Sequence, residues 1–399
     1  MKATNLNFDV IINGAGYIGL ITAFILAKNG LNVVLIDKRK LDINRKEKTS
    51  DKNDPSRLFA IAAASSKFLL DNHICLNMKN LAQPIEGIYV TDYNSNATLE
   101  FDPDEIGLDC LGYMFDEKDL MQDLLNSSFK EKKVTIIDNT EISNVEYSPY
   151  HINLVLKDNK NLQAKLLLAA DGKNSFVRKL LKIKTKKIDY TQDAIICDIK
   201  HEFSHRGIAI ENFYPGGPFA ILPKKDRYCS SIVWSTTNDT FNMLNKLSEE
   251  ELNFIIAQKI NAHLGRVKVT SKIKSYPLSL VVSKDFIKRR VALIGDALHA
   301  IHPIAGQGFN LGLRDIMVIT DLINKQKNLG LDIGSDLMLE NYQKRRARDV
   351  DLMITATHEI NGIFASTFVP TKLFRRIGMR IINKSSFLKK AIMKYAAGY

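Results

Sequence analysis

Three glycines near the start of the chain have the spacing that a phosphate-binding turn requires. Gly14, Gly16 and Gly19 form a G-x-G-x-x-G pattern between two apolar segments. In this pattern the first glycine permits a tight turn, the second lets the backbone approach a pyrophosphate, and the third allows close helix packing. Asp37 ends the next apolar segment, about 20 residues further on, where a carboxylate can bind ribose hydroxyls. These four residues predict dinucleotide binding.

Two further acid–glycine pairs follow apolar runs. Asp171-Gly172 comes directly after residues 165–170, and Gly295-Asp296 ends the run 290–295. Side chains at the carboxyl ends of parallel strands are well placed to contact a ligand. A simple turn is the alternative at Asp171-Gly172. After Asp296, a helix that begins with Gly306, Gly308 and Gly312 favours an anion or an electron-rich ring at its start.

The segments that position these residues predict an α/β sheet. Apolar runs at 8–13, 32–36, 165–170 and 290–295 are typical of buried strands, and 20–28 and 175–181 of helices. A long helix is expected to open at 304 and to run through Ile323, and residues 38–54 are expected to form a surface loop. Further helices are predicted at 61–70, 119–129 and 249–263, a strand hairpin at 85–90 and 97–101, and a meander at 134–137, 142–146 and 152–156.

Residues 195–234 are rich in strand-forming side chains and punctuated by glycine. A β-rich insertion after dinucleotide-binding elements suits a second domain that covers the cofactor and holds a substrate.

The composition is that of a globular protein. The 399 residues carry a net charge of +12 from 56 Lys and Arg against 44 Asp and Glu, and residues 372–399 contain eight cations and no acid. The four scattered cysteines predict neither a disulfide framework nor a zinc site, and no apolar run is long enough to cross a membrane. No recognition motif supports nucleic-acid binding.

The histidines His299 and His302 lie three residues apart, but no third ligand accompanies them, so no metal site is expected. Tyr214 and these two histidines are polar groups that could lie near a substrate. Each is more often a structural residue, and we assign no catalytic side chain.

The three motifs and their surroundings resemble the flavoprotein aromatic monooxygenases of the para-hydroxybenzoate hydroxylase fold. The second motif reads Ala-Asp-Gly-Lys-Asn-Ser over 170–175, with Arg178 three residues on, and the third continues through residues 295–315. Within that group the chain looks most like the ubiquinone-biosynthesis hydroxylases. Residues 217–223 with Trp234, and residues 342–348 with Asp351, are similar to that subfamily.

This resemblance implies an α/β fold: a Rossmann-like FAD-binding domain of the GR2 type, an interleaved β-rich substrate domain and a C-terminal helical segment. The implied FAD-binding domain is discontinuous, covering 1–84, 107–182 and 284–341. The substrate domain would cover 85–106 and 183–283, and a basic helical segment would cover 342–399.

The resemblance also assigns cofactor contacts. Gly14, Gly16 and Gly19 would seat the FAD pyrophosphate and Asp37 the adenosine ribose, where the family more often has Glu. Lys173 and Leu298 stand where smaller residues are usual. The other implied contacts, to the flavin, its ribitol and its phosphates, are Arg57, Asp171, Gly172, Gly295, Asp296, Pro303, Gly306, Gln307, Gly308 and Asn310.

The implied reaction is hydroxylation of a prenylated phenol or quinol ring in ubiquinone biosynthesis, with NAD(P)H and O2 as co-substrates. The alternatives are a flavin hydroxylase of soluble aromatics, a reductase of isoprenoid chains, and a non-catalytic FAD-binding scaffold in a quinone-biosynthesis complex. A homo-oligomer is a further expectation.

We expect a cytoplasmic location, since the scattered cysteines favour a reducing compartment, and the basic tail predicts attachment at the periphery of the inner membrane. Leu373, Ile377, Ile381, Leu388 and Ile392 recur at helical spacing among its cations, which suits a helix on an anionic membrane surface. The alternative is a solvated basic helix that packs on the core through one apolar stripe.

Overall fold

Parallel strands form the centre of the first sheet, in an order different from their sequence. The structure is a computed structural model that describes residues 6–41, 53–93, 98–214, 216–260, 262–301, 306–365 and 378–399. β1 (Leu6–Asn13) lies between β11 (Asn161–Ala169) and β2 (Val33–Ile36), and all three are parallel. β8 (Val134–Ile137) extends the sheet beyond β2, and β19 (Val291–Leu293) extends it beyond β11. The carboxyl ends of β1, β11 and β19 therefore share one edge.

The first sheet is completed by short antiparallel strands and covered by helices. The predicted meander is confirmed only for its last two strands: β9 (Ile142–Tyr147) pairs with β10 (Ile152–Leu156), which pairs with β11. Its predicted first strand, β8, instead pairs in parallel with β2. β18 (Ile287–Lys288) closes the other side of the sheet. The helices that pack together beside this sheet are α1 (Tyr17–Lys28), α4 (Glu117–Lys130) and α8 (Gln307–Asn328). Burial by helices explains why these strands are continuous apolar runs.

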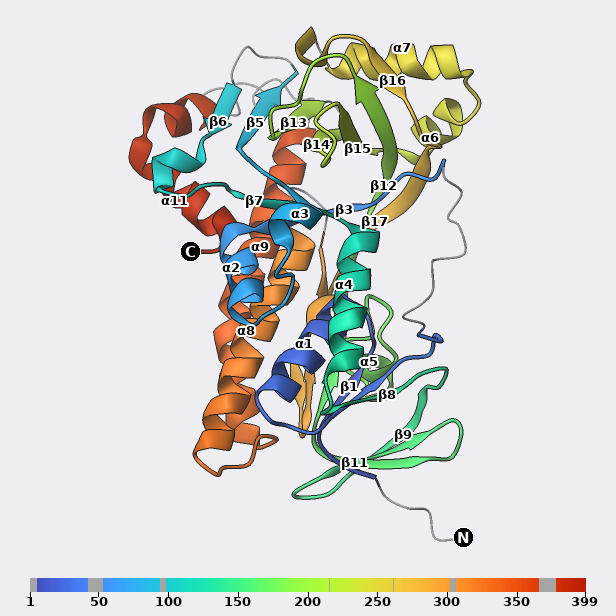
Figure 1. The fold of residues 1–399 in the computed structure, drawn as a ribbon, viewed down its shortest axis with the longest axis vertical. Helices are drawn as coiled ribbons and strands as arrows, with labels where there is room; N and C mark the ends of the chain where they lie inside the picture. Colours follow the sequence, from blue (N-terminus) through green and yellow to red (C-terminus); the bar gives the residue numbers. More distant parts are fainter. Residues whose placement is uncertain are drawn as a thin grey trace.

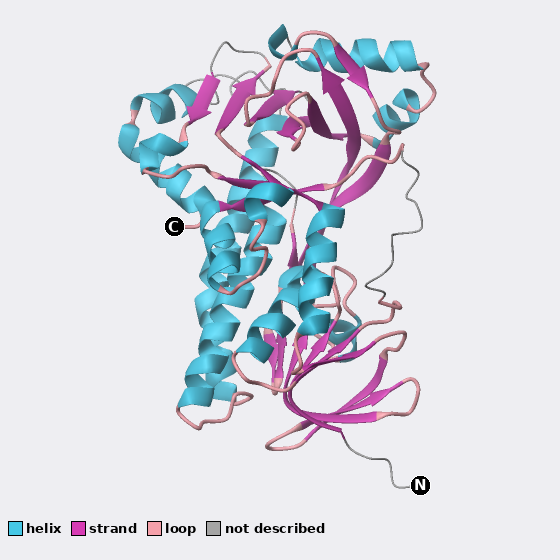
Figure 2. Cartoon of the chain, in the orientation of Figure 1, coloured by secondary structure: helices cyan, strands magenta, loops and turns pink. Residues whose placement is uncertain are grey.

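The second sheet has its own core. Its strands, in spatial order, are β20 (His299–Ala300), β17 (Lys274–Ser283), β12 (Thr185–His201), β15 (Cys229–Thr236), β14 (Gly217–Pro223), β13 (Ile208–Tyr214), β5 (Gly87–Asp92) and β6 (Thr98–Phe101), with β16 (Val267–Val269) paired to β12. α6 (Asn238–Leu244) and α7 (Glu249–Ile260) pack on one face. Figure 1 shows the two sheets at opposite ends of the molecule, and Figure 2 shows a tier of helices between them.

The predicted hairpin is confirmed by the antiparallel pairing of β5 with β6. β5 also pairs in parallel with β13, more than a hundred residues later in the chain, with Gly87 opposite Ile208. This long-range pairing carries the hairpin into the second sheet.

The predicted helix over 61–70 is wrong at its start. Residues Leu58–Ala62 form β3, which pairs with β7 (Gly112–Asp116), and α2 begins only at Ala63 and ends at Asp71. β4 (Ala82–Pro84), which follows the short α3 (Met78–Leu81), pairs with the other side of β7. Tertiary pairing here overrides the local pattern of small residues.

Other predicted ends shift by a few residues. α7 ends at Ile260, and Ala262–Leu264 forms the 3-10 turn η2. β19 ends at Leu293, so that Gly295–Ala297 forms the 3-10 turn η3, and Pro103–Ile106 forms η1. The predicted helix at 175–181 is α5 (Phe176–Leu180). The predicted loop at 38–54 lies largely outside the described residues.

Two helices end the described chain. α9 (Asp336–Ala365) passes through Tyr342, which is fully buried, and α11 (Ser386–Ala397) follows a helical stretch at 378–384. Within the described residues no helix is long and apolar enough to span a membrane.

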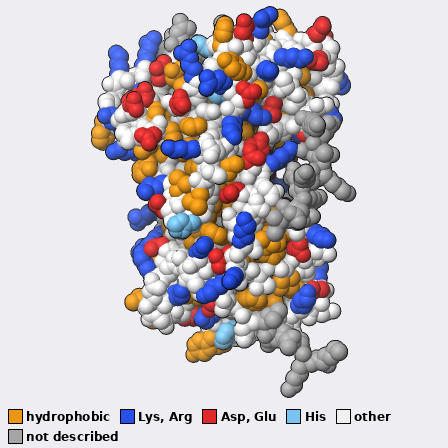
Figure 3. All heavy atoms as spheres, in the orientation of Figure 1, with side chains coloured by type: hydrophobic (Ala, Val, Ile, Leu, Met, Phe, Trp, Pro, Cys, Tyr) orange, Lys and Arg blue, Asp and Glu red, His pale blue; other side chains and the backbone are white. Residues whose placement is uncertain are grey.

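The domain boundaries stay a prediction. Lys and Arg are interspersed with Asp and Glu on the face in Figure 3.

Candidate functional site

The first glycine motif contacts the end of β11. Gly14 has φ +109° and donates its N–H to the Ile36 carbonyl at 2.7 Å. A Cβ atom on Gly14 would lie 2.5 Å from the Ala170 carbonyl oxygen and 2.8 Å from the Cα of Asp171. Only glycine fits this turn, which places the first motif directly against the second.

Gly16 is open to space on its Cβ side, whereas Gly19 is in close contact with the backbone of Gly14. Gly16 is the N-cap of α1, no side chain caps that helix, and a Cβ atom on Gly16 would meet no atom within 4 Å. A Cβ atom on Gly19 would instead lie 1.8 Å from the Gly14 carbonyl oxygen. The start of α1 therefore faces open space with its N–H groups and positive dipole end, as an anion site requires.

Asp37 is buried at the end of β2 and holds the glycine turn. Its Oδ2 accepts the Ala15 N–H at 2.7 Å, and its Oδ1 accepts the backbone N–H and the Nε of Arg39 at 2.8 and 3.0 Å. Burial alone would raise the pKa of Asp37, but the hydrogen bonds from Arg39 and Ala15 outweigh burial and lower it. Asp37 is a carboxylate at neutral pH, and Arg39 is a residue that the sequence patterns did not single out.

The first and third motifs meet through Ile18 of α1. A Cβ atom on Gly295, which has φ +59°, would lie 3.0 Å from Ile18 Cγ1, and one on Gly312 would lie 2.7 Å from Ile18 Cδ1. Gly312 also lies close to Gly295, since its Cβ would be 3.4 Å from the Gly295 Cα. The two glycines thus let α1, α8 and the turn after β19 approach one another.

Arg178 joins the second and third motifs. Its guanidinium is buried and donates to the Ala297 carbonyl at 2.7 Å and to the Lys173 carbonyl at 2.6 Å. Each of the three motifs therefore contacts the other two, although they are far apart in the sequence.

The two carboxylate oxygens of Asp171 have different surroundings. Its Oδ2 accepts the N–H groups of Phe176 and Val177 at 2.7 and 3.2 Å and so caps α5, which is the turn-stabilising role considered as the alternative. Its buried Oδ1 has no hydrogen-bond partner among the described residues. Gly172 has φ +81°, and a Cβ atom there would meet nothing within 4 Å. One oxygen and the adjacent backbone therefore remain for a ligand.

Asp296 is exposed at the meeting point of the motifs. Its side chain is accessible, yet desolvation by the surrounding protein raises its pKa, against the opposing charges of His299, Arg57 and Lys173. Arg57 is exposed, and its guanidinium lies 5.0 Å from the centre of the Phe59 ring. Asp296 and Arg57, remote in sequence, therefore share one electrostatic environment.

β3 lines the start of α8. A Cβ atom on Gly306, the N-cap of α8 with φ +63°, would lie 2.9 Å from the Ala60 Cβ. Asn310 is buried; its Oδ1 accepts the Ala62 N–H and its Nδ2 donates to the Ala60 carbonyl, both at 2.8 Å. Asn310 therefore acts here by fixing β3 against α8.

Two residues of α8 complete this region. Gln307 and Gly308 are partly buried in the first turn, and no side chain caps the helix. Pro303 lies outside the described residues.

The remaining polar residues have structural roles. His299 is fully buried, with Nε2 2.8 Å from Asp315 Oδ2, while His302 lies outside the described residues. The Tyr214 hydroxyl donates to the Lys259 carbonyl at 2.8 Å, on the face of the second sheet that packs on α7. The described residues contain no cluster of three metal-ligating side chains, and all four cysteines are free.

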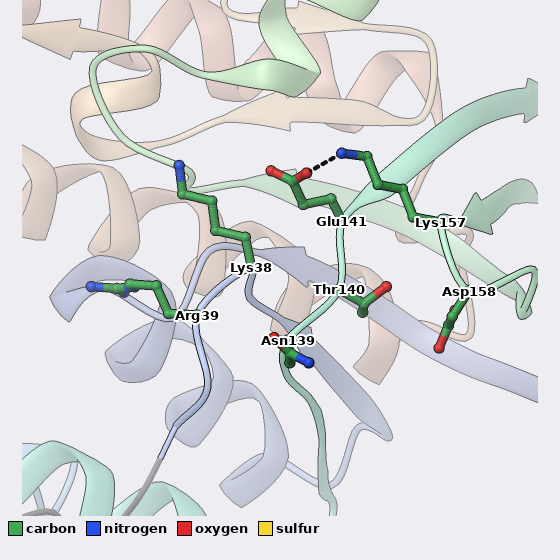
Figure 4. A pocket seen from close by; sticks show the side chains of 7 residues that line it. All are labelled: Lys38, Arg39, Asn139, Thr140, Glu141, Lys157 and Asp158. Atoms are coloured by element: carbon green, nitrogen blue, oxygen red, sulfur yellow. Dashed lines mark hydrogen bonds and ion pairs between the residues drawn. The ribbon is translucent and has the colours of Figure 1, made fainter.

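An open polar pocket of about 640 Å³ lies beside Arg39, outside this meeting point. In Figure 4, Glu141 and Lys157 point toward one another and form an ion pair, while Arg39 points away from them. The pocket contains none of the three motifs. We therefore place the functional site at the motifs and not in this pocket.

The arrangement fits a bound FAD. The space beside Gly16 is open where a pyrophosphate would approach the uncapped start of α1, and Asp171 keeps a free oxygen. α8, the second helix that no side chain caps, begins at the glycine turn of the third motif.

Comparison with known proteins identifies the family. Residues 7–357 match the family described as the FAD binding domain. The chain is 33% identical over 390 residues to ubiquinone hydroxylase UbiL of Rhodospirillum rubrum, covering 98% of this chain and 89% of that protein. It is 30% identical over 401 residues to ubiquinone hydroxylase UbiM of Neisseria meningitidis, covering 99% and 85%.

The solved structure of p-nitrophenol 4-monooxygenase PnpA from Pseudomonas putida has the same fold, with a TM-score of 0.77 at 17% identity and 97% coverage of both chains. The predicted fold class and flavin cofactor are thereby confirmed. The chain belongs to the FAD-binding domain family, and within it to the flavoprotein aromatic monooxygenases that include the ubiquinone hydroxylases.

Proposed function

We propose that this enzyme hydroxylates the aromatic ring of a polyprenylated phenol or quinol intermediate of ubiquinone biosynthesis. The mutual contact of three motifs, in a chain 33% identical to a ubiquinone hydroxylase, carries the proposal. One oxygen atom of O2 enters the ring and the other leaves as water, while NAD(P)H and a proton supply the two electrons and the hydrogen atoms. Bound FAD supplies the redox chemistry.

The protein residues would hold FAD in a fixed order. Gly14, Gly16 and Gly19 seat the pyrophosphate at the start of α1, where the backbone N–H groups and the helix dipole stabilise its charge. Asp37, already fixed by Ala15 and Arg39, accepts hydroxyls of the adenosine ribose.

The second and third motifs would hold the flavin end. The residues that we assign there are Arg57, Asp171, Gly172, Gly295, Asp296, Pro303, Gly306, Gln307, Gly308 and Asn310. Among them, Asn310 acts through β3. We expect the second sheet to cover this end and to exclude water from it.

A direct experiment is to reconstitute the purified protein with FAD and supply a prenylated phenol, NADH or NADPH, and O2. We expect the phenol to accelerate NAD(P)H oxidation and mass spectrometry to detect a product heavier by one oxygen atom. Stronger stimulation by phenols without a prenyl chain would instead favour a soluble substrate. Product formation without O2 would indicate a reductase, and FAD binding without any turnover would indicate a scaffold.

We further propose that the C-terminal helices bind an anionic membrane surface. Phe387, Leu388 and Ile392 of α11 are exposed by 81, 42 and 41%, among the exposed cations Lys384, Lys390 and Lys394. The side of α11 that packs on the protein is a different one: Met393 lies in the apolar cluster beside β13, and Lys389 pairs with Glu105. Exposed apolar side chains among lysines suit the interface of an anionic bilayer.

Replacing Phe387, Leu388 and Ile392 together by serine should weaken binding to anionic liposomes by about tenfold or more, because each side chain buries less apolar area in the bilayer. Liposome flotation of the FAD-loaded protein measures the effect. The matched control replaces Leu329 and Leu331, exposed by 72 and 54% at the far end of α8, and should bind normally. Equal binding by both variants would contradict the membrane proposal. Deletion of the tail is less informative, since it also removes Met393 from the core.

A further inference from the structure

Glu211 of β13 lies on the face of the second sheet opposite to α7. Side chains alternate along a strand, and its neighbours Asn212 and Tyr214 reach the Lys259 carbonyl on the α7 side. Ala209, two residues before Glu211, lies instead in the apolar cluster with Met114 and Met393. Glu211 therefore shares the face of Ala209, which we call the inner face.

The inner face is connected by packing contacts to the residues that we assign to the flavin. Ala209 and Leu222 of this face pack in one cluster with Leu58 and Ala60 of β3. Ala60 in turn lies against Gly306, the N-cap of α8, as shown above. The cluster thus connects the sheet face that carries Glu211 to the glycine turn that we assign to the flavin.

Small and apolar residues surround Glu211 on this face. Its partners across the strands are Ala220 of β14 and Val90 of β5. Ala220 is small, and the side chains of Ala220 and Val90 cannot donate a hydrogen bond to the carboxyl group. The carboxyl group of Glu211 forms no hydrogen bond and no ion pair with the described residues, although the side chain is more than half buried.

Desolvation raises the pKa of Glu211 to about 7, and no neighbouring charge contributes. The ionisable groups on the elements packed around it are few. Asp92 ends β5 on the same face, β14 contributes none, and Glu359 of α9, which packs against β13 and β14, is exposed. An unpaired carboxyl group in such a position is costly unless a ligand completes it.

We propose that Glu211 is a catalytic residue that binds the ring hydroxyl of the substrate and accepts its proton; this inference rests on the proposed function. The O–H bond breaks, the proton passes to a carboxylate oxygen of Glu211, and the bonding pair stays on the ring oxygen. The ring becomes more electron-rich and so more reactive toward an oxygen donor. After oxygen transfer the ring carbon loses its hydrogen as a proton, and Glu211 returns its own proton to the ring oxygen.

The test compares the FAD-loaded wild type with Glu211→Gln, which keeps the shape but cannot take the proton. We expect kcat for a prenylated phenol to fall about 100-fold, as for loss of a general base. The wild-type kcat should rise with pH through about 7, as Glu211 ionises, and this limb should be absent from the variant. Glu100→Gln, the same change at an exposed position of β6, is the matched control and should behave as wild type.

Ligand binding gives a readout that does not depend on turnover. We measure by fluorescence titration the affinities of the prenylated phenol and of its O-methyl ether, without NAD(P)H. The wild type should prefer the phenol by about tenfold at pH 8, where the carboxylate accepts its hydrogen bond, and less at pH 6. In Glu211→Gln the preference should be smaller and independent of pH.

The outcomes separate the two proposals. A wild type that hydroxylates the phenol, with a variant of unchanged kcat, pH limb and phenol preference, overturns the role of Glu211 alone. A wild type that hydroxylates no prenylated phenol overturns the proposed function. A folded, FAD-binding variant that has lost the pH limb and the phenol preference supports Glu211 as the base.

Discussion

Replacing Gly16 by valine should abolish FAD binding and leave the folded apoprotein intact. Gly16 has φ −80° and ψ −177°, an extended conformation that valine adopts readily, and a Cβ atom there meets no protein atom within 4 Å. A side chain that starts from this Cβ atom therefore extends into the space that we assign to the pyrophosphate. Overlap with the ligand and the loss of its N–H contacts together cost about 3 kcal/mol or more. FAD affinity should fall by at least about 100-fold.

The measurement is FAD titration of the apoprotein, combined with thermal unfolding without FAD. Gly16→Val should unfold at the wild-type temperature in the absence of FAD and lack the stabilisation that FAD gives the wild type. Gly14→Ala is the contrasting variant: at φ +109°, 2.5 Å from the Ala170 carbonyl, its Cβ should destabilise the apoprotein itself. Normal FAD affinity in Gly16→Val would show that the pyrophosphate binds elsewhere.

Sequence patterns predicted the turn at Gly14 and Gly16 correctly but missed the strand β3. Gly14 and Gly16 follow β1 directly, so strand, turn and helix are encoded within about 20 residues, and local patterns suffice. β3 was missed because its partner strand lies more than fifty residues away, with Leu58 opposite Asp116. The local sequence of such a run of small residues is equally compatible with a helix and with a strand, because it does not show the partner strand.

The face of a strand is also a long-range property. Residues 195–234 were predicted to be strand-rich, but the side on which Glu211 lies depends on α7 covering one face and on β5 pairing from more than a hundred residues earlier. Similarly, Arg39 became part of the site only because β2 and the glycine turn place it beside Asp37 and Ala15. Its signal in the sequence is only the position two residues after Asp37.

In the basic tail, helical spacing alone did not show which side of α11 is buried. Helical spacing correctly grouped Leu388 with Ile392, and both are exposed. It could not show that Met393 and Ala397 form the side of α11 that is buried, because that choice depends on the cluster contributed by Ile85, Leu111 and Ala209. The residues of the tail before 378 lie outside the described part of the chain.

A buried ionic network stabilises the turn of the third motif. Asp315 of α8 is fully buried; its Oδ2 accepts the Gly295 N–H at 2.8 Å and lies 2.8 Å from His299 Nε2. Its Oδ1 accepts Arg346 Nε of α9 at 2.7 Å, and Arg346 also pairs with Asp349. The turn that carries Asp296 is therefore fixed by a carboxylate with no access to solvent.

Replacing Asp315 by alanine should lower the free energy of unfolding by about 3–5 kcal/mol, since it leaves Arg346 buried without its main partner and Gly295 without an acceptor. Urea unfolding of the apoprotein measures the loss. Asp321→Ala is the control on the same helix: its ion pairs with Lys325 and Arg345 are solvent-exposed, so its effect should stay below about 1 kcal/mol. An equal effect of both substitutions would contradict the network's role.

The pH dependence of stability gives an independent check on Asp315. Burial alone would raise its pKa, but the charges and hydrogen bonds of His299 and Arg346 outweigh burial and lower it. Its stabilising contribution is therefore complete above a pH of about 4, the ordinary aspartate value, and is lost as the pH falls through the lower folded-state pKa. Asp315→Ala should show a correspondingly weaker loss of stability in acid. Adding Arg346→Met to Asp315→Leu should recover part of the loss, because no buried charge then lacks its partner.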